Sequence, residues 1–360
     1  MQKVRLSGIQ LGMLFVGFLY GSSSLLNPAF SALQDGWLAF LIGWMLGIII
    51  IAVYISIYLL NPSQTLIGIL KSNFGRFLGT VIGILYAWYF LHLAAIVLRD
   101  FGEFSLLVIL PNTPLPFIIG CFAALCVYSL KKGIEVTART GELLIPLIPL
   151  ASLIVTLGIA RLIDFSNIKP VLANGIKPVL TTGFGVLSFP FGETVCFLMV
   201  FPLLRKRSTL RKTVFISTVI AGLLLLIIVV RDILALNPQL TQRAAFPAEL
   251  ASKLFPVINI YPLILLNLLI GGTIKVIVCL YASAAAITEL SGLSDYKALL
   301  SSITGFSVTL SIWLYDNVMQ MFEFAVSTYP YYALPFQIII PVLLLIISII
   351  RRTSERRKTS

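Results

Sequence analysis

The chain has 360 residues, of which 59% are hydrophobic and 11% are charged, and its mean hydropathy is +1.02. A water-soluble domain cannot carry so little charge, so the composition excludes a soluble enzyme or binding module and indicates an integral membrane protein. The formal net charge of +12 does not indicate a nucleic-acid partner, because the basic residues stand in short segments between apolar runs and at the C-terminus.

Ten apolar runs follow one another along the chain, separated by charged or Gly/Pro-rich breaks. Inside a bilayer every backbone polar group must be satisfied within its own element, so these runs are expected to be helices. The runs fall at about 9–31, 37–60, 78–98, 116–130, 142–160, 183–203, 213–235, 262–287, 298–315 and 333–350. The sequence therefore predicts an all-α integral membrane protein with about ten transmembrane helices, forming a single polytopic membrane domain over 1–360.

The distribution of Lys and Arg predicts the orientation of these spans. With the N-terminus inside, most basic residues fall in cytoplasmic segments, as the positive-inside rule requires. Residues 351–360 then form a basic cytoplasmic tail, and an even number of spans places it on the same side as the N-terminus. Both termini are expected in the cytoplasm.

Two spans are interrupted where a continuous helix would be expected. The first contains Gly21-Ser22-Ser23-Ser24 followed by Asn27-Pro28, and the sixth contains Phe189-Pro190-Phe191-Gly192-Glu193. Spans one and six are equivalent members of two five-span halves, at about 1–165 and 175–350. Paired breaks indicate an inverted 5+5 repeat with a substrate site near the bilayer midplane. The alternative is that these Gly and Pro residues only kink two helices.

Unwound backbone at the midplane exposes N–H and C=O groups that can hold the carboxylate and the ammonium of an amino acid. Gly21 would let a ligand approach the main chain, and the three serines offer hydroxyls, although each can equally bond back to a carbonyl one turn earlier. The candidate substrate-binding residues are Gly21, Ser22, Ser23, Ser24, Phe191, Gly192, Glu193 and Lys275.

Glu193 and Lys275 are ionisable residues inside apolar spans, where charge is costly unless it is paired, hydrated or neutralised. Glu193 could accept a substrate ammonium, bind a proton or brace the unwound segment. Lys275 could stand in for a coupling cation between spans one and eight, or reach to one interface. His92, two turns before Arg99-Asp100, is either part of a proton relay or a packing residue.

Motifs for catalysis and metal binding are missing from the sequence. The four cysteines lie in apolar runs without CxxC or CxxH spacing, and we find no phosphate loop, HExxH motif or GxSxG elbow. We therefore expect no catalytic residue, no metal, no cofactor and no enzymatic activity.

Several segments together resemble one known family, and the similarity runs from about residue 5 to residue 350. They are the break at Gly21, Ser188–Glu193 with Phe201-Pro202, Ile274-Lys275-Val276, Gly292–Lys297, and the loop Ile168–Leu172 with Gly175–Pro178. In these residues the chain resembles the B subunits of spore germinant receptors, which are spore germination permeases of the amino acid, polyamine and organocation superfamily.

The resemblance implies a leucine-transporter-like fold with the ligand between spans one, three, six and eight. It also implies a multi-pass protein of the inner membrane of a spore-forming bacterium, working with a larger A subunit and a lipoprotein C subunit. Three functions stay open: a receptor subunit that binds an amino acid or similar nutrient and triggers germination, a proton-coupled amino-acid permease, and a pure scaffold.

The loop before span eight carries two further expectations. Its apolar segments Phe246–Glu249 and Leu254-Phe255-Pro256 could fold back as a lid. Where many members of the family carry an acidic and arginine pair, this chain has Asn259-Ile260-Tyr261-Pro262, which argues against a polar gate at that position.

Overall fold

A computed structural model describes residues 5–254 and 261–359. Throughout these residues the regular structure is helical, apart from one isolated parallel β-bridge between Leu6 and Leu204. Eight helical segments in the described chain are long and apolar enough to cross a bilayer, and two shorter apolar helices, Gly8–Tyr20 and Leu300–Trp313, complete the ten predicted spans.

The first five spans are built from seven α-helices and two short 3₁₀ segments. In chain order they are α1 (Gly8–Tyr20), η1 (Ser22–Ser24), η2 (Pro28–Asp35), α2 (Gly36–Leu60), α3 (Leu66–Phe74), α4 (Arg76–Val108), α5 (Leu115–Lys132), α6 (Ile134–Leu144) and α7 (Leu147–Gly158). The short helix α3 connects spans two and three, and α6 with α7 makes span five.

The second five spans repeat this arrangement after a connection through η3 (Ala160–Leu162) and η4 (Phe165–Ile168). They comprise α8 (Ile176–Val186), η5 (Leu187–Phe191), η6 (Gly192–Met199), η7 (Phe201–Leu203), η8 (Arg207–Thr209), α9 (Leu210–Leu236), α10 (Pro238–Arg243), α11 (Pro247–Lys253), α12 (Tyr261–Ser291), η9 (Tyr296–Ala298), α13 (Leu300–Trp313), α14 (Val318–Glu323), η10 (Phe324–Thr328), α15 (Tyr329–Leu334), η11 (Pro335–Ile339) and α16 (Ile340–Thr359).

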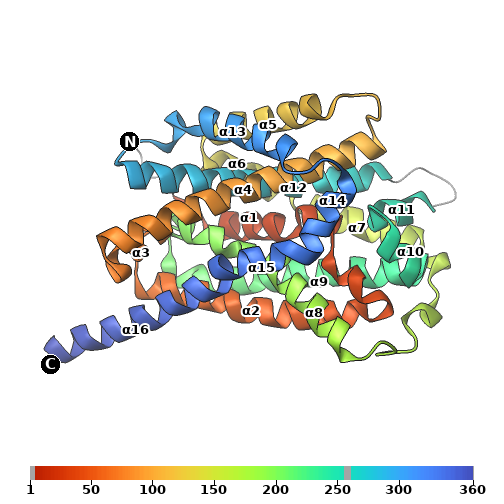
Figure 1. Cartoon of the computed structure of the whole chain (residues 1–360), viewed down its shortest axis with the longest axis horizontal. Helices are drawn as coiled ribbons and strands as arrows, with labels where there is room; N and C mark the ends of the chain where they lie inside the picture. Colours follow the sequence, from red (N-terminus) through yellow and green to blue (C-terminus); the bar gives the residue numbers. More distant parts are fainter. Residues whose placement is uncertain (1–4, 255–260, 360) are drawn as a thin grey trace.

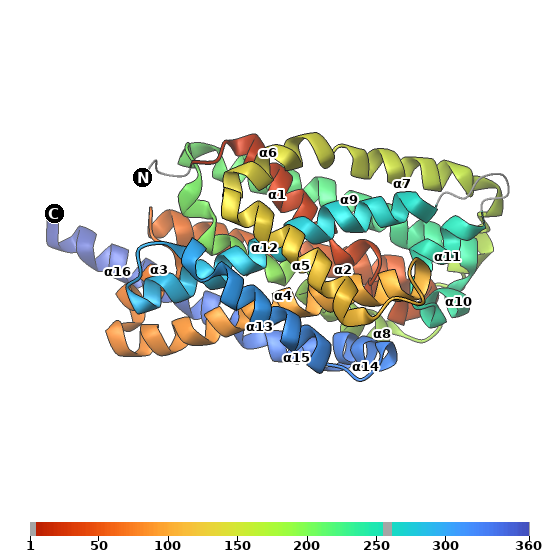
Figure 2. The ribbon, with the colours of Figure 1, turned by 90° about the horizontal axis from the view of Figure 1, so that it is seen from above.

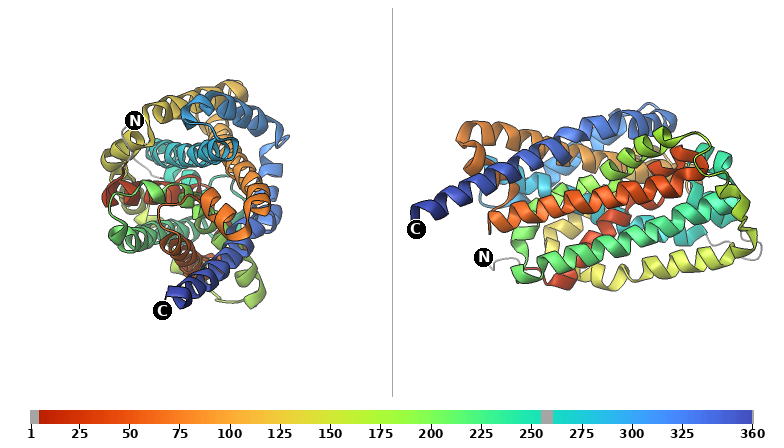
Figure 3. Two further views of the ribbon diagram at one scale, coloured as in Figure 1. Left: turned by 90° about the vertical axis from the view of Figure 1, so that its left-hand side faces the viewer. Right: turned by 90° about the horizontal axis from the view of Figure 1, so that it is seen from below.

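The spans run roughly along the long axis of one bundle, and both ends of the chain lie at the same end of it (Figure 1). That arrangement agrees with an even number of crossings. The last helix, α16, extends beyond the bundle and continues to Thr359, so the basic segment predicted as a tail prolongs span ten as helix through residue 359 (Figures 2 and 3).

Burial separates the central helices from those at the lipid-facing surface. Helices α4 and α12 pack on each other, and both are largely buried. Peripheral helices instead expose large apolar side chains, such as Ile49 on α2, Phe117 on α5 and Leu157 on α7. Exposed leucine, isoleucine and phenylalanine are expected where the surrounding solvent is hydrocarbon.

The third span is much longer than its apolar run, because charged residues that end the run lie inside the helix. Arg99 and Glu103, one turn apart on α4, form an ion pair of 2.8 Å. Arg99 also donates to the carbonyls of Ser311 and Ile312 at the end of α13. Paired and hydrogen-bonded charges can be buried, so the helix runs on to Val108.

Candidate ligand cavity between the broken helices

The first break begins at Gly21, where the helix of α1 ends. Its backbone leaves helical geometry at φ −8° and ψ −118°, and its N–H still bonds to the carbonyl of Gly17. The Ser24 hydroxyl donates to the Gly21 carbonyl, so this serine bonds back to the turn before it. Asn27 then caps η2 by accepting from the N–H of Ala29, which restarts the helix after seven residues that include the short segment η1.

The second break lies at Phe189, whose φ of −128° and ψ of 111° interrupt span six between α8 and η6. The freed backbone is held by side chains from other spans. Gln337 of span ten donates to the Ser188 carbonyl and accepts from the Ser188 hydroxyl, both at 3.0 Å. Tyr54 of α2 donates to the Gly192 carbonyl at 3.0 Å. Satisfied carbonyls allow an irregular backbone to persist at membrane depth.

An ion pair links the break in span six to span eight. The Nζ of Lys275 lies 2.6 Å from Oε2 of Glu193, and both side chains are at most 1% exposed. Lys275 also donates to the Ser22 hydroxyl at 3.3 Å, and its ammonium stands 4.3 Å from the ring centre of Phe189. The Tyr329 hydroxyl donates to Oε1 of Glu193 at 2.6 Å. One cluster therefore joins both breaks, α12 and α15.

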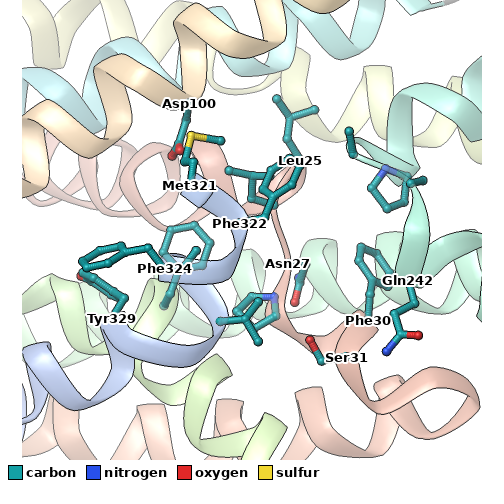
Figure 4. Close-up of a pocket in the computed structure, with 18 of the residues that line it drawn as sticks. Leu25, Asn27, Phe30, Ser31, Asp100, Gln242, Met321, Phe322, Phe324 and Tyr329 are labelled. Carbon is teal, nitrogen blue, oxygen red and sulfur yellow. The ribbon is translucent and has the colours of Figure 1, made fainter. Parts of the chain in front are cut away.

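A cavity of about 570 Å³ opens between the two breaks and span ten. Figure 4 shows Asp100 and Tyr329 at one side of it and Asn27, Ser31 and Gln242 at the other. Most of its wall is apolar, from Leu25, Leu26, Phe30, Ile96, Phe189, Met321, Phe322 and Phe324. A largely apolar wall with a few placed polar groups is the usual composition of a small-molecule site.

The mouth of the cavity faces the end of the bundle opposite the chain termini. Its outer wall contains the exposed residues Gln242 and Arg243 at the end of α10 and Met319 on α14. These helices lie far from the N- and C-terminal ends (Figure 1). Pro247 of α11 also lines this wall, which brings the predicted lid segment Phe246–Glu249 to the mouth. The rest of the predicted lid, Phe255 and Pro256, lies outside the described residues, as do Asn259 and Ile260 of the predicted gate position.

The end that carries the termini is closed beneath the cavity. Leu6 exchanges two backbone hydrogen bonds with the segment after span six, from its N–H to Leu203 and from the N–H of Arg205 to its carbonyl. Above this bridge the rings of Phe15 and Phe18 on α1 pack against Phe197, at centroid distances of 4.7 and 5.2 Å. In the part of the chain that the structure describes, the cavity therefore opens toward the end of the bundle opposite the termini.

Of the eight predicted site residues, one lines the cavity and seven do not. Glu193 lines the cavity, while Lys275, Ser22 and Ser23 are fully buried beside or behind it. Phe191 packs against Phe40 of α2, and Gly192 lies beneath Gln337. Gly21 abuts Gly271 of α12 rather than the cavity wall. The structure thus brings both breaks and Lys275 together, and ligand binding by these residues stays a prediction.

Sequence reasoning did not select several residues that line the cavity. They are Asp100, Tyr315 and Tyr329, together with Asn27, Ser31, Thr241, Gln242 and Arg243. Asp100 carried a usable signal, because it is a carboxylate next to an apolar run in span three. His92 lies outside the cavity lining; its ring packs against Trp88 and Tyr332, as expected for a packing residue.

A bundle of ten spans whose first and sixth members are both interrupted belongs to the leucine-transporter fold class. Two solved structures share it. One is a Na⁺-coupled sialic acid symporter in a substrate-bound outward-open state, with a TM-score of 0.67 and 15% identity over 96% of this chain and 89% of the other. The second is MhsT in complex with L-phenylalanine, with a TM-score of 0.66 and 12% identity over 96% and 99%.

The sequence comparisons give the family. A family model described as "Spore germination protein" matches residues 5–320. Spore germination protein KB of Bacillus subtilis (strain 168) is 33% identical over all of this chain and 98% of its own length, and the putative spore germination protein YfkT of the same organism is 26% identical over 82% of each. The chain belongs to the spore germination protein family and is a membrane subunit of the germinant receptor type.

Proposed function

We propose that this chain binds a small nutrient germinant, such as an amino acid, in the cavity between its two broken spans and thereby triggers spore germination. The observation that carries the proposal is the cavity itself. It lies where the fold interrupts spans one and six, it is mostly apolar, and carboxylate and hydroxyl groups reach into it from three different spans. Sites of this kind bury small ligands and fix their orientation with few polar contacts.

The signal would be a change between two states of the bundle. In the structure the cavity is open toward α10 and α14, and the opposite end is closed by the Leu6–Leu204 bridge and the phenylalanines above it. A ligand that contacts both breaks favours the state in which the mouth closes, and its differential affinity for that state supplies the free energy.

The setting of the subunit is part of the proposal. The chain would lie in the inner membrane of the spore with both termini in the cytoplasm, where the basic end of α16 meets the anionic leaflet. It would pass the conformational change to a larger A subunit and a lipoprotein C subunit. Support comes from family membership, the shared end of the two termini and the positive-inside charge distribution.

The second candidate function is a proton-coupled amino-acid permease. The fold favours it, because one of the solved structures that share the fold is a symporter. A buried carboxylate beside the cavity, Glu193, is a group that could carry the proton. The two functions differ in turnover, since a permease moves many solute molecules and a sensor needs to bind only one.

Germination dose-response curves test the proposal. Spores carrying Ser31→Phe or Gln242→Ala, which alter the cavity wall, are compared with wild type against a panel of amino acids, sugars and nucleosides, at equal receptor abundance in the inner membrane. A shifted half-maximal concentration for one nutrient supports a pocket in this chain. Unchanged curves place recognition in another subunit. Uptake of radiolabelled solute into proteoliposomes containing the chain, driven by a proton gradient, would favour the permease.

A further inference from the structure

The inner part of the cavity contains more negative than positive charge. Two buried carboxylates, Asp100 and Glu193, reach its wall, and each is at most 5% exposed. One buried ammonium, that of Lys275, stands beside them. Arg99, the neighbour of Asp100 in sequence, is bound to Glu103 and to two carbonyls of α13. This part of the site therefore holds two acids and one base.

Lys275 forms an ion pair with Glu193. Their atoms lie 2.6 Å apart, and Tyr329 donates to the second oxygen of the same carboxylate. Asp100 forms no ion pair within 4.0 Å with any residue of the described chain. It bonds to the Ser22 hydroxyl, and the nearby ammonium of Lys275 is the one that Glu193 already engages. Two buried carboxylates that share one ammonium are costly, and Asp100 faces the open volume of the cavity (Figure 4).

The remaining walls of the cavity indicate which kind of cationic ligand could neutralise Asp100. Around it the wall is apolar, with Met321, Phe322 and Phe324 from span ten and Leu25 from the first break. Toward the mouth stand Asn27, Gln242 and Arg243, whose side chains can donate hydrogen bonds. The cavity thus has a carboxylate at its inner side, an apolar middle and donors at its outer side.

We propose that Asp100 is the recognition point for a ligand ammonium, so that the germinant is a primary amine with a small apolar body, such as a neutral amino acid whose carboxylate points to the mouth. The inference deepens the function proposed above and rests on it. It moves ammonium recognition from Glu193, which Lys275 already neutralises, to a residue of span three. A sugar or nucleoside would leave Asp100 without a counter-ion.

The test uses the full-length chain in lipid nanodiscs and measures binding by calorimetry. The probes are the L-amino acids and, for each one that binds, the amine that lacks its carboxylate and the acid that lacks its amino group, with D-glucose and inosine as uncharged solutes. We expect the binding amino acid to lose at least 30-fold in affinity when its amino group is absent, and less when its carboxylate is absent.

Asp100→Asn tests whether Asp100 acts as a charged carboxylate or as a neutral, protonated one. The amide keeps the shape of the side chain and a hydrogen-bond donor but carries no charge. We expect Asp100→Asn to weaken binding of the amino acid at least 10-fold, and Asp100→Glu to restore affinity to within about 5-fold of wild type. Asp316→Asn is the matched control, since Asp316 is exposed and follows the cavity residue Tyr315 without lining the cavity. It should bind as wild type does.

Wild-type affinity in Asp100→Asn, or binding of only the uncharged solutes, overturns the inference. In the second case the germinant-binding function stands and only the ligand class is wrong. Absence of binding for every probe overturns both. If Asp100→Asn does not give a folded protein by size-exclusion chromatography, the comparison of amino acid and desamino acid on the wild-type chain decides.

Discussion

Gly271 of α12 lies against the backbone of Gly21 at the first break. A Cβ atom on Gly271 would stand 2.9 Å from the Cα of Gly21 and 3.0 Å from its nitrogen, closer than packed atoms allow. Two glycines therefore set how closely spans one and eight approach, as small residues do where membrane helices cross. The same contact keeps Ser22 within reach of Lys275 one turn further along α12.

Gly271→Ala should separate these two spans. We expect a destabilisation of about 1–3 kcal/mol, the usual range for an overpacked contact, and a germination curve shifted at least 5-fold to higher nutrient concentration. The measurements are thermal unfolding of the purified chain and germination dose-response at matched abundance. Gly272→Ala is the control, because its added Cβ would have no neighbour closer than 3.6 Å. Equal behaviour of the two variants would contradict the glycine contact.

The ion pair between Lys275 and Glu193 predicts strong non-additivity. Lys275→Met or Glu193→Gln alone leaves one buried charge without its partner and should cost about 3–5 kcal/mol of stability. The double variant removes both charges and should recover most of that loss. Unfolding of the four proteins in a double-mutant cycle gives the coupling energy. Additive losses would show that the two charges do not depend on each other.

Tyr329→Phe removes the hydroxyl that donates to Glu193 and lies 3.1 Å from the hydroxyl of Tyr89. A hydrogen bond to a charged group contributes about 1.5–3 kcal/mol, so this variant should unfold at a lower temperature and bind nutrient more weakly. Tyr331→Phe makes the same change on an exposed residue two positions away and should have no effect. The prediction fails when both variants unfold alike.

Cysteine labelling tests the direction of the cavity and the orientation of the chain. In a background with the exposed Cys121 changed to Ser, Arg243→Cys should react with a membrane-impermeant maleimide added outside intact cells that express the chain. Thr353→Cys, near the end of α16, should react only after permeabilisation. Saturating nutrient should slow labelling at Arg243→Cys, because the residue lines the mouth of the cavity. The reverse labelling pattern would invert the topology.

Much of the fold could be predicted because membrane helices are recognisable in a sequence by their length and apolar content. The ten spans, the breaks at Gly21 and Phe189 and the position of Glu193 and Lys275 inside the bundle all followed from residue type and position. Span ends were less predictable. Arg99 ended an apolar run in the sequence, yet in the structure it is neutralised within and beyond its own helix, so the span continues.

Pairwise contacts in the site could not be predicted in the same way. Several spans are apolar on every face, so the sequence does not show which side of a helix meets the cavity. That Lys275 binds Glu193, that Gln337 satisfies Ser188 and that Tyr329 joins the cluster depend on how distant spans pack. Asp100 was visible as a charge at the end of a run, but only the structure shows that it shares the single ammonium of Lys275 with Glu193.

The β-bridge between Leu6 and Leu204 gives the closed end of the bundle a mechanical role. Its two backbone hydrogen bonds join the segment before span one to the segment after span six. The inner halves of the two broken helices are therefore linked and would move as one rigid body. The unwound residues near Gly21 and Phe189 are then the places where this rigid body would rotate relative to the outer halves. A ligand that contacts the unwound residues would therefore be linked through these two half-helices to the end of the bundle that carries both chain ends.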